Sequence, residues 1–301
     1  MAAIPLKPSW IEGIKYVTPR PDYVLTGRDG MVSIPWEGRP PIPLEEKDFE
    51  KLAGDPAPDY DMVGNGMYLA LRHKPDCTFA AEYAAILKEA YPHIISELGG
   101  QIIMLDAKEV DTPYLDRKIN FLKIMALIDP GNAGVHQEIA RTYADKGSRL
   151  STLHQATDSW YGAEKHLKRA LELNPADLHS GYEYGEALYV LGRYDRAAEV
   201  WLELPEELEP AGREKIEGRI AAIRSGRLPK VPPVDYLTAI AMAVESHHAG
   251  LNDEAAAIIE DVLADPVFPE QFPMNEVHYL LGTCYQEMGM MNEAAEAFRR
   301  S

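Results

Sequence analysis

Two short clusters of polar residues are the first candidates for chemistry in this sequence. His247 and His248 form its one pair of adjacent histidines, and residues 206–209 form an acidic run after Pro205. Adjacent side chains on a helix do not face the same way, so these histidines are poorly placed to share a metal ion. An acidic run after a proline is typical of a solvated helix start; the alternative is a docking point for a basic partner.

The sequence patterns of several common catalytic and metal sites are absent. The chain has no phosphate-binding glycine loop, no GxSxG nucleophile elbow, no HExxH zinc helix and no EF-hand calcium loop. We therefore expect no catalytic residues, no metal and no cofactor, and we predict that the protein is not an enzyme. An enzyme that also carries helical repeats stays open as an alternative.

The composition indicates a globular protein with a strongly acidic surface. Of 301 residues, 46% are hydrophobic and 26% are charged, and no apolar run is long enough to span a bilayer. The net charge of −18 disfavours nucleic acid and anionic membranes as partners.

Cys77 and Cys284 lie far apart, so we expect two buried thiols. No secretory or transit peptide is readable at the start, and we expect a cytoplasmic protein.

The elements that would position any site change character along the chain. Residues 1–75 hold eleven of the 23 prolines, so they predict an irregular arm rather than one long helix. Within it, residues 23–26 and 31–34 flank a glycine-bounded turn and predict a small β-hairpin. Residues 45–53 predict a short helix, followed by a linker at 55–60. The arm is rich in aromatic residues, so we expect it to pack along another element, the alternative being a partly ordered tail.

Helical spacing of apolar residues dominates after Asp76. Residues 76–130 predict irregular helical pairs, and residues 131–301 predict a regular array with a break near 206–233. The array shows internal similarity, because residues 184–201 align without a gap on residues 281–298. In both segments Gly, Gly, Ala and a closing aromatic residue occur at the same offsets, which points to a repeat architecture.

This spacing resembles the tetratricopeptide repeat (TPR), a helix–turn–helix unit of 34 residues. The resemblance implies an all-α solenoid of helical hairpins, with units near 133–175, 177–205, 234–266 and 273–301. The first unit carries extra residues between Gly147 and Trp160, which predict a lengthened turn or helix extension at one edge. Residues 206–233 predict one amphipathic helix and a proline-rich bend.

Small residues have distinct expected roles in these hairpins. Gly185 and Gly282 lie mid-helix, where a small side chain lets two helices approach closely. Gly192, Gly250 and Gly289 are expected to end first helices in a left-handed conformation. Alanines 163, 197, 255 and 294 are expected to face the small residue of the first helix. Trp201, Leu167, Ile259 and Phe298 are expected to fill the space between adjacent hairpins.

The resemblance also implies a binding surface, because the first helices of successive TPR hairpins line a concave groove. Tyrosines and carboxylates dominate the positions that point away from the hairpin core. The predicted groove consists of Glu138, Arg141, Tyr182, Glu183, Glu186, Tyr189, Tyr279, Gln286 and Glu287. Aromatic rings beside carboxylates suit a basic or amphipathic segment of another protein, the alternative being plain solvated surface. A clamp for acidic chaperone tails is not expected, because Arg141 is the one cation at these positions.

The sequence therefore predicts a non-catalytic scaffold or adaptor of TPR type that binds another protein in its groove. One alternative is an accessory subunit of a larger complex, docked through the N-terminal arm. A further expectation concerns the last hairpin, whose outer edge should expose Ala297 and Phe298. Such an edge would favour a homo-oligomer or a partner docked at the C-terminal end.

Overall fold

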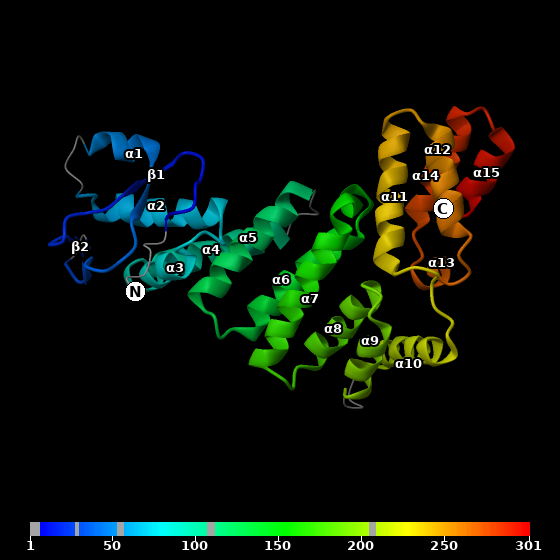
Figure 1. Cartoon of the computed structure of the whole chain (residues 1–301), viewed down its shortest axis with the longest axis horizontal. Coiled ribbons are helices and arrows are strands. Elements are labelled where there is room, and N and C mark those ends of the chain that lie inside the picture. The colour runs from blue at the N-terminus through cyan, green and yellow to red at the C-terminus, as the bar shows by residue number, and fades with distance from the viewer. Residues whose placement is uncertain (1–6, 28–29, 53–56, 107–111, 205–208) are drawn as a thin grey trace. The chain divides into compact units, whose positions relative to one another are not determined.

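The computed structural model describes residues 7–27, 30–52, 57–106, 112–204 and 209–301, and helices dominate these segments (Figure 1). The chain forms two units, residues 1–135 and 136–301. Strands occur, among the described residues, only in the first unit. No helix in the described part of the chain combines the length and the apolar character needed to cross a lipid bilayer.

Two small antiparallel pairs make up the strands of the first unit. Strand β1 (Ile14–Val17) pairs with β4 (Ile42–Glu45), and β2 (Val24–Thr26) pairs with β3 (Ser33–Pro35). The second pair is the predicted β-hairpin, in which Leu25 lies opposite Ile34 and both side chains are buried. The tip of its turn, at residues 28 and 29, lies outside the described residues.

Helices α1 (Glu46–Lys51) and α2 (Tyr60–His73) of the first unit pack on these strands, so the arm is part of a core. The next helices are α3 (Ala80–Ala90), α4 (Pro92–Asp106) and α5 (Thr112–Ile128). Leu44 of β4 and Trp36 are buried in the same apolar cluster as Met67 and Leu71 of α2. The Tyr83 hydroxyl of α3 donates to the Pro41 carbonyl at 2.8 Å. The predicted end of α1, at Ala53 and Gly54, lies outside the described residues.

Helix α2 departs from the prediction that residues 1–75 are irregular apart from short elements. Asp59 begins the helix by accepting a hydrogen bond from the Met62 N–H at 2.9 Å. Glycines at 64 and 66 are unfavourable inside a helix, but both lie at close contacts, and a Cβ at Gly64 would lie 2.4 Å from the Tyr91 ring. A Cβ atom at Gly66 would lie 1.8 Å from the Pro43 carbonyl oxygen, so only glycine lets β4 approach this closely.

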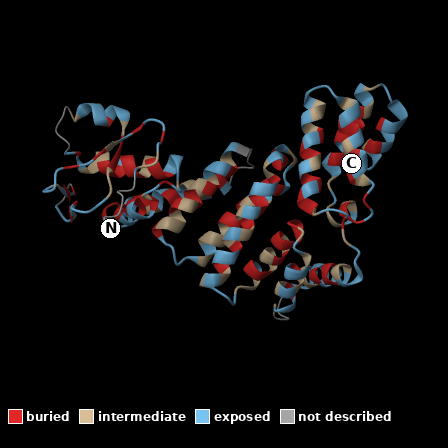
Figure 2. Ribbon diagram, viewed as in Figure 1, coloured by how far each residue is buried: buried red, intermediate tan, exposed pale blue. Residues whose placement is uncertain are grey.

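The second unit consists of helical hairpins. Its elements are α6 (Ala133–Ser148), the 3-10 helix η1 (Leu150–Gln155), α7 (Ala156–Leu173), α8 (Leu178–Val190), α9 (Tyr194–Leu202), α10 (Pro210–Ser225), α11 (Pro233–His248), α12 (Asn252–Leu263), α13 (Phe268–Gln271), α14 (Asn275–Glu287) and α15 (Met291–Arg299). Helices α11 and α12 form one hairpin and α14 and α15 form another (Figure 1). Buried residues follow one side of helices such as α7 and α12, as amphipathic packing requires, whereas residues 187–190 at the end of α8 are buried on all sides (Figure 2).

Glycine and an aromatic ring hold two of these hairpins together. A Cβ at Gly185 would lie 2.1 Å from Trp201 Nε1, and a Cβ at Gly282 would lie 2.6 Å from the Phe298 ring. The Trp201 Nε1–H also donates to the Tyr182 carbonyl at 3.2 Å. These rings therefore pack between the two helices of one hairpin, not only between adjacent hairpins as predicted. The reason is that Gly185 and Gly282 on the first helices have no side chain, which leaves room for the whole ring of Trp201 or Phe298.

Three helix ends share one backbone geometry, as the repeat predicts. Gly192, Gly250 and Gly289 have φ angles of 75°, 78° and 77°. In each case the N–H of the next residue donates to the carbonyl five positions earlier, as in Arg193 to Leu188. This is the Schellman arrangement, which satisfies carbonyl groups at the end of a helix.

Each of the two irregular segments of the array packs against a neighbouring regular hairpin. Extra residues of the first repeat form η1 and lengthen α7, and α11 packs against both elements. The amphipathic helix predicted within residues 206–233 is α10, and a proline-rich stretch follows it. The buried Asp265 carboxylate accepts N–H bonds from Lys230, Val267 and Phe268 at 2.8–3.0 Å. Asp265 therefore ties the proline-rich bend to the end of α12. The whole is an all-α, TPR-like helical solenoid with a proline-rich N-terminal arm.

Candidate protein-interaction surface

The first helices of the first two hairpins bring part of the predicted groove together. Arg141 on α6 donates from Nε to Glu183 Oε1 on α8 at 2.6 Å, and Gln137 Nε2 lies 3.4 Å from the other Glu183 oxygen. The hydrogen bond with Glu183 is the main cause that raises the pKa of Arg141. Glu138 is half-buried on α6, one turn before Thr142. Helices α6 and α8 thus present one continuous face, on which Glu183 is already paired with a cation.

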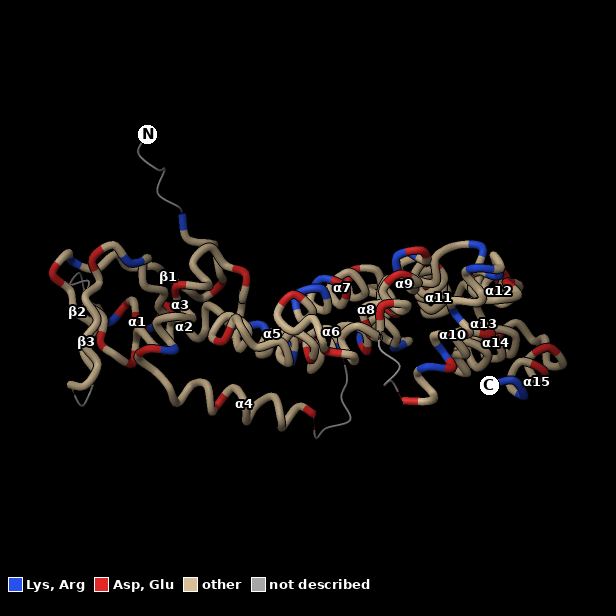
Figure 3. The backbone as a smooth tube through the Cα atoms, turned by 90° about the horizontal axis from the view of Figure 1, so that it is seen from below, with Lys and Arg blue, Asp and Glu red and all other residues tan. Residues whose placement is uncertain are grey.

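The next part of this face is covered by α10. Lys215 Nζ lies 2.7 Å from Glu186 Oε2 and 5.9 Å from the centroid of the Tyr182 ring. Arg219 Nε lies 3.4 Å from Glu186 Oε1. Tyr182 and Glu186 are therefore half-buried beneath the chain's own cations. Basic residues and glutamates alternate along residues 213–219 of α10 (Figure 3).

Tyr189 does not face a groove. Its exposed fraction is 0%, and its hydroxyl donates to Gln271 Oε1 at 2.6 Å. The Arg219 guanidinium carbon lies 4.1 Å from the Tyr189 ring centroid and 4.9 Å from that of Phe272. The prediction that Tyr189 lies outside the hairpin core is wrong, because its ring lies 4.9 Å from the Tyr194 ring and 5.9 Å from the Trp201 ring of α9. The sequence signal that was missed is the pair of cations, Lys215 and Arg219, beside the apolar stripe of α10.

The remaining predicted residues lie on α14, in the last hairpin. Tyr279 is 62% exposed, and Gln286 and Glu287 are also exposed. The Tyr279 ring lies 5.4 Å from the Phe298 ring. The predicted exposure of Ala297 and Phe298 is wrong, because Ala297 is 5% exposed and Phe298 is half-buried against Gly282.

Other residues singled out in the sequence have structural partners. His247 Nδ1 lies 2.7 Å from Asn252 Oδ1 and 3.7 Å from the sulfur of Cys284. Both cysteines are buried free thiols, as predicted. In the described part of the chain, no group of three or more His, Cys, Asp or Glu side chains is placed to hold a metal ion. Most of the acidic run, at residues 206–208, lies outside the described residues, and Glu209 precedes α10.

Comparisons with known proteins found distant structural similarity. No known protein family and no curated protein sequence matches the chain. Two crystal structures of a protein called MamA are similar at 16% identity. One alignment covers 62% of this chain and 86% of that chain with a TM-score of 0.25, and the other covers 69% and 88% with a TM-score of 0.27. At these scores the likeness carries no argument, and the TPR-like assignment rests on the hairpin geometry.

Proposed function

We propose that this protein is a non-catalytic scaffold of TPR type that binds a segment of another protein along the face formed by α6 and α8. The observation that carries the proposal is the Arg141–Glu183 pair, because it spans the first helices of two consecutive hairpins. Such a face suits an amphipathic segment with a basic side chain, because it carries the carboxylates of Glu138 and Glu183. The chain's acidic net charge of −18 favours a basic partner as well.

A site-specific photo-crosslinking experiment tests this proposal. A photoreactive residue replaces His179, which is exposed on α8, and in a second protein replaces Asp195, which is exposed on α9. We expect one protein to be crosslinked in cells from position 179 and not from position 195. Identical crosslinked proteins from both positions, or none from position 179, would contradict the proposal.

Matched charge reversals then separate binding from folding. Glu183→Lys breaks the ion pair with Arg141 on the proposed face, and Glu199→Lys breaks the ion pair with Arg196 on α9. We expect only the first change to weaken the crosslink at position 179. Circular dichroism should show the same helix content for both variants.

A second candidate is docking through the N-terminal arm, as an accessory subunit of a larger complex. Two large apolar side chains of the arm favour it, because Trp10 is 81% exposed and Met31 is 84% exposed. Hydrogen exchange with and without the crosslinked partner distinguishes the two surfaces. Protection of residues 7–35 without protection of α6 and α8 would favour the arm.

A further inference from the structure

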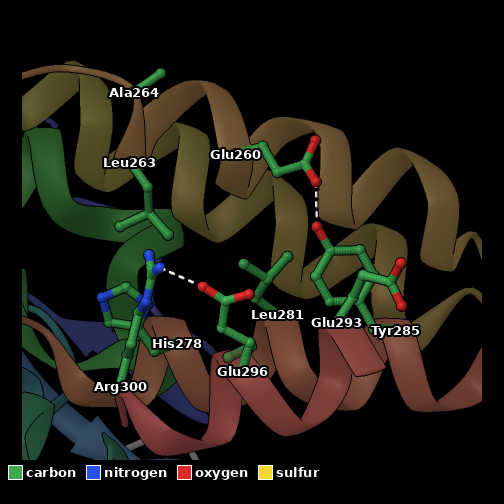
Figure 4. Close-up of a pocket in the computed structure, with 10 residues that line it drawn as sticks. Glu260, Leu263, Ala264, His278, Leu281, Tyr285, Glu293, Glu296 and Arg300 are labelled. Carbon is green, nitrogen blue, oxygen red and sulfur yellow. Dashed lines mark hydrogen bonds and ion pairs between the residues drawn. The ribbon is translucent and has the colours of Figure 1, made fainter. Parts of the chain in front are cut away.

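A pocket of about 350 Å³ lies between α12, α14 and α15 in the second unit. Leu263 of α12 and Leu281 of α14 point into it, and Ala297 of α15 adds to its apolar lining (Figure 4). Three carboxylates surround this apolar surface, one from α12 and two from α15. They belong to Glu260, Glu293 and Glu296.

The charges around the pocket do not balance. Glu260 accepts a hydrogen bond from the Tyr285 hydroxyl, and Glu296 pairs with Arg300 at 2.5 Å. Within the described residues, Glu293 has no hydrogen bond or ion pair. Burial, and then the charge of Arg300, lower the pKa of His278, so this side chain is neutral at neutral pH. Three carboxylates thus face a single cation.

The same unit holds a second pocket at the equivalent position of the repeat. It lies between α7, α8 and α9, has a volume of about 530 Å³ and is lined by Leu171 and Val200. Aligning Gly185 with Gly282 places Val200 on Ala297, and aligning Ala163 with Ala255 places Leu171 on Leu263. The apolar lining is therefore common to both pockets, as expected where outer helices of neighbouring hairpins meet.

The charged residues at the equivalent positions are reversed. Lys168 and Arg196 line the pocket between α7 and α9 where Glu260 and Glu293 line the other. Conversely, Glu203 corresponds to Arg300. Because hairpin packing needs only the shared apolar residues, the packing does not account for the carboxylates. They give the pocket between α12 and α15 a preference for positive charge.

We propose that the pocket between α12, α14 and α15 binds a lysine or arginine side chain of a partner protein. The aliphatic stem of that side chain lies on Leu263, Leu281 and Ala297, and its cationic end lies among the carboxylates of Glu260 and Glu293. An acidic rim around an apolar floor fits such a side chain, and the pocket volume admits one. This site is separate from the face of α6 and α8, so the proposal does not depend on binding there.

Methyl NMR titration of the full chain tests the proposal with two blocked tripeptides. One is leucyl-arginyl-leucine amide, and the other has citrulline, which has nearly the same shape without the charge, in place of arginine. We expect the arginine peptide to shift the methyl signals of Leu263, Leu281 and Ala297 and to bind roughly fivefold more tightly than the citrulline peptide. The methyl signals of Leu171 and Val200, in the equivalent pocket, should respond less.

Variants of one exposed carboxylate make the test specific. Glu293→Gln should remove most of the preference for arginine over citrulline. Glu293→Arg introduces the residue type found at the equivalent position 196 and should abolish the preference. Glu254→Gln, on α12 away from the pocket, is the matched control and should leave the preference unchanged. The methyl spectrum outside the pocket reports whether each variant is folded. Equal shifts by both peptides, no shifts, or a preference that survives Glu293→Arg would overturn the proposal.

Discussion

Replacing Asp265 by asparagine tests how the second unit holds its bend. The carboxylate is 2% exposed and accepts three backbone N–H bonds, and the Tyr236 hydroxyl donates a further bond at 2.8 Å. Burial alone would raise the pKa of Asp265, but these donors lower it from 3.8 to about 2. That difference corresponds to roughly 2 kcal/mol of stabilisation at neutral pH. Asparagine has nearly the same shape but cannot accept at its nitrogen, so we expect a loss of about 2–3 kcal/mol.

The stabilisation should depend on pH with a defined sign. The folded-state pKa of Asp265 is depressed, so its contribution is complete above the ordinary value of 3.8 and is lost as the pH falls toward about 2. Urea unfolding of wild type and Asp265→Asn between pH 7 and pH 3 measures this. Tyr236→Phe removes one donor and keeps the carboxylate, so it should cost about 1 kcal/mol and retain the pH dependence. A difference between wild type and Asp265→Asn that is below about 0.5 kcal/mol, or equal at pH 5 and pH 3, would refute the reasoning.

Three further predictions concern the packing of the second unit and are measured by urea unfolding. Gly185→Ala and Gly282→Ala should each cost ~1–3 kcal/mol through contact with Trp201 or Phe298, whereas Gly218→Ala, with nothing within 4 Å of its Cβ, should not destabilise. Gly192→Ala should cost more than Gly250→Ala, because both have positive φ but only a Cβ at 192 meets Pro232, at 2.7 Å; equal losses would exclude that contact. Glu186→Gln should lower the free energy of unfolding by ~3 kcal/mol, because it leaves the buried Arg219 charge unpaired. Adding Arg219→Met should recover part of this loss, and additive effects of the two changes would contradict the coupling.

The hairpins were predictable because their signals are local in sequence. A glycine seven residues before a second glycine, followed by an aromatic residue, specifies a close helix pair and a left-handed turn without distant contacts. The β-hairpin at 24–35 is confirmed for the same reason, because its alternating residues and turn glycines are adjacent. Helix α2 was missed because the reason for its glycine lies in strand β4, more than twenty residues earlier.

The candidate site was less predictable. The repeat spacing identifies which side chains point away from the core of a hairpin, but it does not show which other segment of the chain packs over them. Arg141 and Glu183 are brought together as expected for neighbouring first helices. Helix α10 packs through Ile216 and Ile220 on the apolar cluster that contains Trp201, and its Lys215 and Arg219 reach Glu186 across about thirty residues of sequence. No repeat spacing predicts that contact, since α10 belongs to the irregular segment between units.

One repeat position shows how covering and side-chain chemistry change together along the second unit. Tyr182, Ile240 and Tyr279 each lie three residues before the small residue of a first helix. Tyr182 is half-buried beneath Lys215, Ile240 is 0% exposed in the apolar cluster that contains Phe268 and Val277, and Tyr279 is 62% exposed. A purely apolar side chain occurs where covering is complete, and tyrosine occurs where one side of the ring meets charge or solvent. Of the three, only Tyr279 has a ring that is largely exposed to solvent.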